Sequence, residues 1–301
     1  MKRLGSVDNS SLDTRRPASY SRDPETSRNA RAYCTELDQI KSREQVATCR
    51  DPNCQQPLNL NIIVPVYNEG ENINHLYKSL CDALDKKSLN SSDTYSISWK
   101  AYIIYDFAQD TTVPFIKALQ MNDSRIVPTP QTLGKGALNA LKHGFSIVHD
   151  DAVIVVMGDC SDDLTTIPRM IHEIESGATI VTSSRFIKGG RYFGGNYFKK
   201  CLSRTAGMIL SLFGIGTNDP TNNFKMYSGK WIKSQKIESQ GGFEIALELI
   251  VKAALTKKKI VEIPGIWKDR TIGESKFDVK KLLPHYIRWF LFFIRSKIFR
   301  N

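Results

Sequence analysis

The stretch Ala152-Val-Ile-Val-Val-Met-Gly-Asp-Cys-Ser-Asp-Asp163 decides how the rest of the chain is interpreted. Its first six residues are an apolar run rich in Val and Ile, which predicts a strand buried on both faces. Three acids, Asp159, Asp162 and Asp163, follow where that strand should end. Ligands of open α/β sheets bind outside the carboxyl ends of the strands, so these acids are candidates to hold a cation and the phosphates it bridges. Equally, they could cap the next helix.

Size and cysteine usage limit the class of protein. With 301 residues, the chain is long enough to bury a sizeable core. Its cysteines lack the paired spacing of a zinc site or of a small disulfide framework. No apolar secretory leader follows Met1, so a reducing, cytosolic compartment is expected. The six cysteines are Cys34, Cys49, Cys54, Cys81, Cys160 and Cys201.

Positive charge is concentrated at the end of the chain. The formal net charge is +11, and residues 264–301 carry nine Lys or Arg against three Asp or Glu. Such a basic end indicates an anionic partner, either nucleic acid, membrane headgroups or a phosphorylated acceptor. A solvated charged face is the plainer interpretation. No nucleic-acid partner is expected, because the aromatic residues cluster in one apolar helix and do not interleave with Lys and Arg on a sheet face.

Strands and helices alternate from residue 58 onward. Residues 1–57 are polar, contain four prolines and have no sustained apolar period, which predicts a disordered extension. The alternation that follows predicts an α/β domain over residues 58–277, with a mostly parallel sheet covered by helices on both faces. The expected strands are 60–67, 96–105, 125–127, 152–157, 178–183 and 259–263, and the expected helices are 72–86, 112–121, 135–149, 167–176, 197–213 and 245–255.

A last helix is expected over residues 279–298, within a basic segment of residues 278–301. Its longest apolar run, Trp289–Ile294, is far shorter than the roughly 20 residues of a membrane span. Aromatic residues interspersed with Lys and Arg suit a helix lying in an anionic membrane interface. The alternative is a helix packed on the core with a basic outer face. The first reading predicts a protein attached peripherally to the cytoplasmic face of a membrane.

Several short motifs recur at the ends of the expected strands. A carboxylate can accept hydrogen bonds from base or ribose groups, a ring can stack, and the N–H groups of a helix start suit a phosphate. The first-half motifs are Pro65-Val-Tyr-Asn-Glu69, Ile103-Ile-Tyr-Asp106 and Gly134-Lys-Gly136. The second-half motifs are Ser184-Arg185-Phe186 with Gly189-Gly190, Asp219-Pro-Thr-Asn-Asn-Phe224, Gly242-Phe-Glu244 with Glu248, and Arg270-Thr-Ile-Gly-Glu-Ser-Lys276.

In number, order and spacing these motifs resemble the inverting nucleotide-sugar glycosyltransferases of family 2. The match is best with the branch of dolichol-phosphate mannose synthases and bacterial polyprenyl-phosphate sugar transferases, and it implies a single sheet of the glycosyltransferase-A type. The nucleotide-sugar contacts implied by the resemblance are Pro65, Tyr67, Glu69, Asp106, Lys135, Gly136 and Asp159. The implied catalytic residues are Asp159, Arg185, Asp219, Arg270 and Lys276, and the implied acceptor-phosphate contacts are Arg185, Arg270, Ser275 and Lys276.

The metal motif of this family is altered here. Asp159 matches the last acid of its Asp-x-Asp motif, and Met157 stands where the first acid is expected. Similarly, Tyr105 replaces the first acid of the second-strand motif. The resemblance implies Mg²⁺ or Mn²⁺ on Asp159, helped by Asp162, because a divalent ion can neutralise the leaving diphosphate while it sits on one or two carboxylates.

The acceptor distinguishes the possible functions. A sugar hydroxyl needs a general base, and the Glu-Asp pair common in relatives that use one is missing because Ile245 follows Glu244. A lipid monophosphate is already ionised, since its second pKa is about 6. We therefore expect transfer from a GDP- or UDP-sugar to polyprenyl phosphate. The alternatives are a soluble or polysaccharide acceptor with Glu244, Glu248 or Asp219 as base, and a catalytically silent nucleotide-sugar binder.

Overall fold

The computed structural model describes residues 58–85, 97–148, 151–270 and 279–299. The predicted N-terminal extension, residues 1–57, lies outside the described residues. The same holds for two predicted phosphate contacts, Ser275 and Lys276. Those predictions therefore stay predictions.

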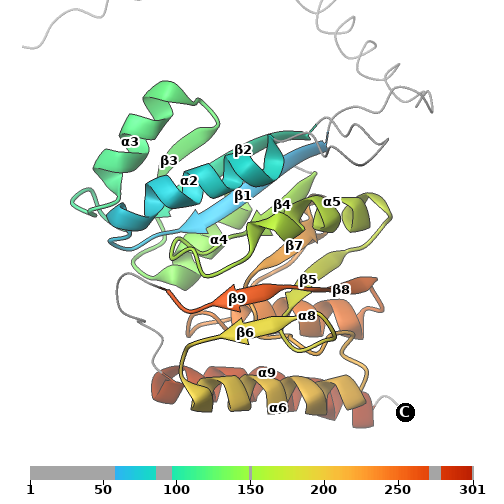
Figure 1. The fold of residues 1–301 in the computed structure, drawn as a ribbon. Helices are drawn as coiled ribbons and strands as arrows, with labels where there is room; N and C mark the ends of the chain where they lie inside the picture. Colours follow the sequence, from blue (N-terminus) through green and yellow to red (C-terminus); the bar gives the residue numbers. More distant parts are fainter. Residues whose placement is uncertain (1–57, 86–96, 149–150, 271–278, 300–301) are drawn as a thin grey trace, which may run out of the picture. The chain divides into compact units, whose positions relative to one another are not determined.

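Seven strands form the main sheet, in the order β3-β2-β1-β4-β7-β5-β8 (Figure 1). All neighbours are parallel except β7, which runs antiparallel to both β4 and β5. The predicted mostly parallel sheet is thus confirmed. The strands are β1 Leu58–Pro65, β2 Ile97–Tyr105, β3 Ile126–Pro130, β4 Ala152–Val155, β5 Ile180–Ser184, β7 Lys225–Ser228 and β8 Ile260–Pro264.

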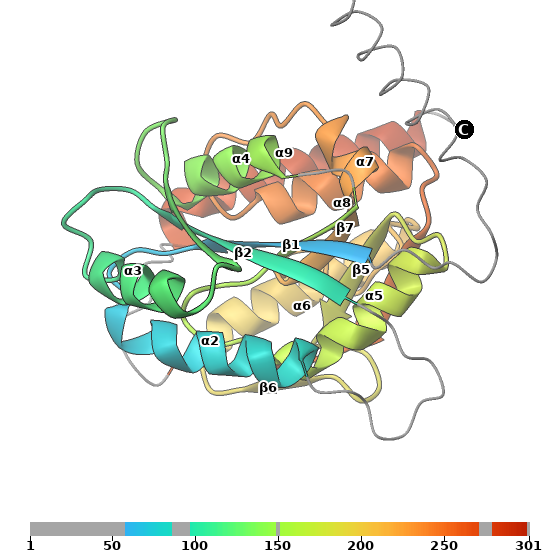
Figure 2. The same cartoon turned by 90° about the horizontal axis from the view of Figure 1, so that it is seen from above.

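Helices cover both faces of this sheet, as expected from the alternating pattern. Figure 2 shows α2, α3 and α5 on one side, and α4, α7, α8 and α9 on the other. The helix α6 packs beside α9 (Figure 1). Their bounds are α2 Gly70–Leu84, α3 Val113–Asn122, α4 Ala137–Ile147, α5 Ile167–Glu175, α6 Tyr197–Leu212, α7 Gly229–Lys233, α8 Ile245–Leu255 and α9 Val279–Ile298.

Alternation along the strands divides the core in two. Successive side chains of a strand point to opposite faces of the sheet. In β4, Ile154 packs into the core under α2 and α5, whereas Val153 and Val155 pack into the core under α4, α8 and α9. All four residues of β4 are buried. Because both faces need apolar side chains, the strand reads as an unbroken apolar run in the sequence.

A second, two-stranded sheet was not predicted. β6 (Arg191–Phe193) pairs in parallel with β9 (Ile266–Lys268), in segments where no strand was predicted. The main sheet is of the expected type, and this small second sheet is an addition to it. β9 is also joined to the loop after β4, because Asp163 N–H donates to Ile266 O at 3.2 Å and Lys268 N–H donates to Ser161 O at 3.0 Å. These hydrogen bonds hold β9 beside the loop that follows β4, so the residues after β9 lie near the end of β4.

The C-terminal helix α9 has the predicted bounds and packs on the core through Trp289 and Phe293, which are both buried. Within the described residues, none of the helices combines the length and the apolar character that a membrane span requires.

Candidate active site

Three segments far apart in the sequence meet at the carboxyl ends of β1 and β4. Glu69 precedes α2, Asp159 follows β4, and Arg270 follows β9. Arg270 Nη2 donates to Asp159 Oδ2 at 2.6 Å, and Arg270 Nη1 lies 3.5 Å from Glu69 Oε1. The three side chains are only 11–20% exposed. A guanidinium therefore joins two of the carboxylates that the sequence assigns to the donor site.

The loop before α2 is held by a buried acid. Asp110 accepts hydrogen bonds from Asn68 N–H at 3.0 and 3.1 Å and from Thr112 N–H at 2.8 Å. Glu69 N–H donates to Thr112 Oγ1 at 2.9 Å. Asn68 needs this support because its φ of 56° lies in the left-handed region. Asp110 thus positions Glu69 from the neighbouring β2–α3 connection.

Asp106, at the end of β2, organises the loop before α4. Its Oδ1 accepts from Gln131 Nε2 at 2.7 Å, and its Oδ2 accepts from Gly136 N–H at 2.9 Å. The Gly136 N–H predicted for a phosphate is therefore already donated to a carboxylate. Gly136 has a φ of 112°, which explains the glycine at this turn.

Aromatic rings lie beside these acids. Tyr67 is exposed and meets Phe107 edge to face, with ring centroids 5.6 Å apart. Lys135 Nζ lies 5.5 Å from the Phe107 centroid. Pro65 is buried as the last residue of β1. The predicted donor contacts Tyr67, Asp106 and Lys135 thus lie at adjoining strand ends, together with Phe107, which the sequence reasoning did not single out.

The three acids after β4 have separate roles. Asp163 caps the short 3-10 helix η1, Leu164–Thr166, by accepting from Thr165 N–H at 3.1 Å. Asp159 Oδ1 accepts from Ser161 N–H at 3.1 Å, while Oδ2 receives Arg270. Burial, reinforced by the charge of Asp159, raises the pKa of Asp162 to about 7. The capping interpretation of this stretch is therefore confirmed for Asp163, whereas cation binding by Asp159 and Asp162 stays a prediction.

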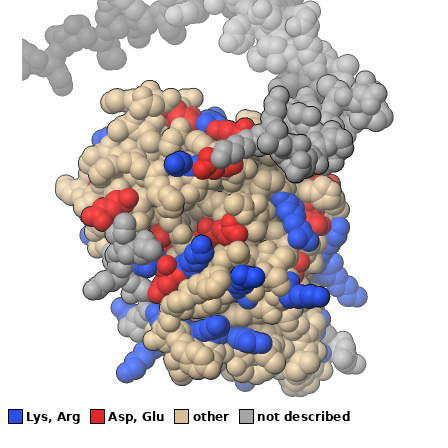
Figure 3. Space-filling view, viewed as in Figure 1, with Lys and Arg blue, Asp and Glu red and all other residues tan. Residues whose placement is uncertain are grey.

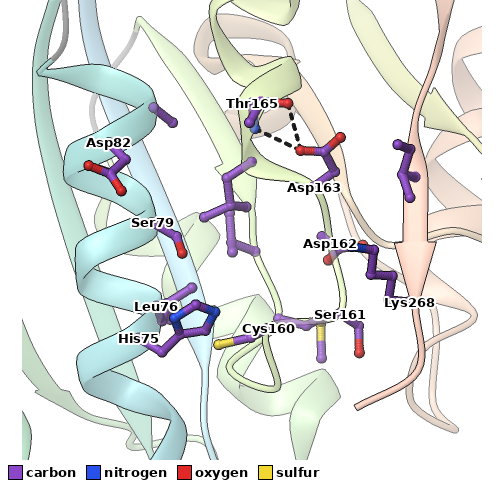
Figure 4. A pocket seen from close by; sticks show the side chains of 15 residues that line it. His75, Leu76, Ser79, Asp82, Cys160, Ser161, Asp162, Asp163, Thr165 and Lys268 are labelled. Atoms are coloured by element: carbon purple, nitrogen blue, oxygen red, sulfur yellow. Dashed lines mark hydrogen bonds between the residues drawn. The ribbon is translucent and has the colours of Figure 1, made fainter. Parts of the chain in front are cut away.

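A cavity of about 570 Å³ lies beside the acidic loop, between α2 and β9 (Figure 4). It is lined by His75, Ser79, Asp162 and Lys268, among others. Glu69, Asp159 and Arg270 are not part of its lining. Figure 3 shows acidic side chains in the middle of this face, whereas the charged side chains of α6, in the lower part of the view, are Lys and Arg.

Arg185 and Asp219, both predicted to be catalytic, are paired with each other. Arg185 Nε and Nη2 each donate to Asp219 at 2.7 Å, and Arg185 N–H donates at 3.0 Å. Burial alone would raise the pKa of Asp219, but the Arg185 guanidinium holds it below its usual value. Fully buried and bonded in this way, Asp219 is not available as a general base.

The other two predicted bases are also buried, although Glu244 Oε2 has no hydrogen-bond partner among the described residues. Glu244 Oε1 accepts from Gln240 N–H at 3.0 Å and Gly241 N–H at 2.6 Å. Glu248 accepts from two backbone N–H groups at 2.7 and 2.8 Å and from Lys252 Nζ at 2.7 Å. Both glutamates have no exposed surface. Their roles are therefore to fix the loop before α8.

Lys225 is a buried cation that the sequence reasoning missed. It begins β7 and donates from Nζ to the carbonyl oxygens of Asp219 and Asn222. Desolvation lowers its pKa to about 7. The only sequence signal was a lysine between Phe224 and Met226 in an otherwise apolar strand.

The residues at the end of β4 fit a divalent ion that enters together with a diphosphate. Among the residues that the structure describes, no group of three His, Cys, Asp or Glu side chains is placed to hold a metal. Asp159 supplies one carboxylate, Met157 stands in place of a second, and burial raises the pKa of the nearby Asp162 to about 7. Mg²⁺ is commonly bound through one or two carboxylates plus substrate phosphates. Such a set is sufficient only when the substrate completes it.

Known proteins resemble the chain in sequence. A dolichol-phosphate mannosyltransferase from Pyrococcus furiosus is 26% identical over 235 residues, which is 77% of this chain and 62% of that protein. A bactoprenol glucosyl transferase from Shigella phage SfX is 31% identical over 128 residues, covering 42% of this chain and 39% of that protein. The chain thus spans less than two thirds of the length of these curated relatives.

The fold is shared with a solved enzyme. Glucosyl-3-phosphoglycerate synthase from Mycobacterium tuberculosis, solved with Mn²⁺, uridine diphosphate and glucosyl-3-phosphoglycerate, has a TM-score of 0.53 at 13% identity, and the match covers 80% of each chain. This likeness confirms the glycosyltransferase-A type of fold. The family model of glycosyl transferase family 2 matches residues 61–234, more than half of the chain. The chain therefore belongs to glycosyl transferase family 2.

Proposed function

We propose that this chain transfers a sugar, with inversion, from a nucleoside-diphosphate sugar to a polyprenyl phosphate at the cytoplasmic face of a membrane. The observation that carries the proposal concerns the predicted general bases. Asp219, Glu244 and Glu248 are all buried and bonded to donors. None of the three has exposed surface to offer an acceptor hydroxyl, whereas a phosphate monoester needs no base, because it arrives ionised with a second pKa of about 6.

The donor half of the site is built for a nucleoside diphosphate. Tyr67 and Phe107 offer ring edges and faces to a base, and Glu69 and Asp106 offer acceptors to base and ribose groups. Asp159, with Asp162 near it, would hold Mg²⁺ or Mn²⁺ against the diphosphate. Such an ion, when bound, neutralises charge on the departing group. Arg270 contributes positive charge at the same place, because it already lies on Asp159.

The acceptor half contains a second partly buried arginine. Arg185 is fixed by Asp219, and its guanidinium carbon lies 5.1 Å from the Phe186 ring centroid and 5.4 Å from that of Tyr192. The planar fork of an arginine suits a phosphate. In the proposal, Arg185 and Arg270 orient the lipid phosphate, together with Ser275 and Lys276, for one in-line attack on the sugar.

A surface for the membrane is supplied by α6 with α9. Neither helix contains an acidic residue, and together they carry many exposed large apolar side chains among Lys and Arg. This composition suits binding to an anionic membrane interface. The exposed apolar residues of this surface are Tyr197, Phe198, Leu202, Met208, Ile209, Leu212, Ile287, Leu291, Phe292, Ile298 and Phe299.

The test is transfer to a lipid with and without its phosphate. Full-length protein is incubated with radiolabelled GDP- and UDP-sugars, Mn²⁺, and either polyprenyl phosphate or the matching unphosphorylated polyprenol. We expect label extractable into organic solvent only with the phosphate. Asp159→Asn should abolish this label, and Asp163→Asn, which alters only the helix cap, should retain most of it. Label transferred only to a water-soluble sugar acceptor, or nucleotide binding without any transfer, would refute the proposal.

A further inference from the structure

Two carboxylates of the donor site, Glu69 and Asp159, each present one oxygen to Arg270. Glu69 Oε2 accepts from Asn72 Nδ2 at 2.7 Å, and Asp159 Oδ1 accepts from Ser161 N–H at 3.1 Å. The remaining oxygens, Glu69 Oε1 and Asp159 Oδ2, are those that face the Arg270 guanidinium. The protein therefore neutralises this pair of acids with its own cation.

Arg270 and a divalent ion require the same oxygen. A metal–oxygen bond to Mg²⁺ is about 2.0–2.1 Å long, and the ion demands nearly ideal octahedral geometry. Arg270 Nη2 lies 2.6 Å from Asp159 Oδ2. A second positive group at that oxygen is repelled by the guanidinium, and the repulsion is strong because the site is partly buried. Met157, in place of another acid, also lacks the negative charge that a second aspartate would give the ion.

A diphosphate changes this balance. Its oxygens are good partners for a guanidinium, which can bind phosphate through two parallel hydrogen bonds. They are also ligands for the ion, so a site with one carboxylate becomes sufficient. Arg270 and the divalent ion can then both bind to the diphosphate, whose negative charge adds to that of the two carboxylates.

We propose that Arg270 is the resident counter-ion of Asp159 and Glu69, and that it gives up Asp159 to a divalent ion only when a nucleoside diphosphate arrives. The inference rests on the proposed function and deepens it, because it makes ion and nucleotide binding mutually dependent. Binding free energies are reciprocal, so the ion strengthens nucleotide binding by the same factor as the nucleotide strengthens ion binding.

The experiment measures Mn²⁺ binding from the loss of the free-ion electron paramagnetic resonance signal. Full-length wild type is titrated alone, with GDP and with UDP. We expect weak binding alone and binding tighter by about tenfold or more with whichever nucleotide fits, in the range of typical coupling between sites. Arg270→Gln should bind Mn²⁺ without nucleotide about tenfold more tightly than wild type. Lys230→Gln, which removes an equal charge at an exposed position on α7, should not.

The outcomes separate this inference from the proposed function. Equal Mn²⁺ affinity in wild type and Arg270→Gln without nucleotide would overturn the counter-ion role. The inference would also be overturned if a nucleotide binds to the wild type but leaves its affinity for Mn²⁺ unchanged. If neither nucleotide binds at all, the proposed function fails, and the comparison of the two proteins with Mn²⁺ alone still tests Arg270. Should Arg270→Gln fold poorly, the wild-type titrations with and without nucleotide decide.

Discussion

Arg185 forms a bidentate ion pair with Asp219, with two side-chain N···O distances of 2.7 Å. The backbone N–H of Arg185 donates a further hydrogen bond to Asp219. Arg185 follows β5 directly, and Asp219 begins the turn that leads into β7. The pair therefore joins the ends of two strands that lie side by side in the sheet. Ser203 of α6 also accepts from Arg185, at 3.3 Å. Any movement of Asp219 should thus displace the arginine that is proposed to orient the acceptor.

Asp219→Asn should lower both stability and activity. The variant leaves a nearly buried guanidinium without its counter-charge, and breaking such a pair costs about 3–5 kcal/mol. Urea unfolding measures this cost. Asp85→Asn is the matched control, because Arg125 donates to Asp85 with two nitrogens at 2.7 and 3.0 Å but the side chains are 33% and 39% exposed. That exposed pair should contribute about 0–1 kcal/mol. Similar losses in both variants would contradict a structural role for the buried pair.

The sequence predicts six of the seven strands of the main sheet because these six are mostly apolar, and it misses β7, which has only four residues and begins with Lys225. β1, β2 and β4 alternate with helices whose apolar faces repeat at helical spacing, and these elements occur where expected. β6 and β9 have three residues each and are at least partly exposed, so no apolar period marks them. Their pairing depends on residues some 75 positions apart. Local patterns cannot contain that information.

Motifs in the sequence can name the residues of the candidate site, but they do not reveal the contacts that those residues make. Glu69, Asp159 and Arg270 are recognised from motifs, and the structure brings them together. That Arg185 is bonded to Asp219 could not be predicted, because a motif names residue types and not their partners. The burial of Glu244 and Glu248 was likewise hidden, since an acid at a helix start is ordinary in a sequence.

Asp162 should make stability depend on pH. Its pKa is raised from 3.8 to about 7, so the folded protein keeps this proton when the unfolded chain has lost it. The contribution of the group to stability is therefore complete below pH 3.8 and is lost as the pH rises through about 7. Asp162→Asn mimics the protonated form. Relative to wild type, its free energy of unfolding should increase between about pH 5 and 8, as measured by urea titration.

The control for this prediction is Asp82→Asn, which removes an exposed carboxyl of α2 that lines the same cavity. Its difference from wild type should not change in the same way over that pH range. A difference between Asp162→Asn and wild type that is constant with pH would show that the carboxyl of Asp162 is not protonated in the folded protein at neutral pH.

Gly207→Ala should disturb the Asp219 turn from the α6 side. A Cβ at residue 207 would collide with the backbone carbonyl of Asn218, the residue before Asp219. Overpacking of this kind costs typically about 1–3 kcal/mol, because backbone must shift. Thermal unfolding measures the loss. Thr205→Ala, at an exposed position of the same helix, is the control, since it adds no atoms against the turn. If the stability of Gly207→Ala is unchanged, α6 can move away from the Asp219 turn without cost, and the prediction is wrong.

The α6 and α9 surface should bind anionic vesicles through its apolar side chains. Leu212→Glu replaces a side chain that is 86% exposed, so folding should be unaffected, whereas vesicle binding should fall by tenfold or more. That estimate follows from the burial of a leucine, about 1.5–3 kcal/mol, since 1.4 kcal/mol corresponds to a factor of ten. Met121→Glu is the matched control, because Met121 is 87% exposed on α3, on a different helix. Co-sedimentation with phosphatidylglycerol vesicles measures both variants. Equal vesicle binding by Leu212→Glu and Met121→Glu would show that only the net charge of the protein attracts it to the vesicles. Loss of wild-type binding at moderate salt would support the same conclusion.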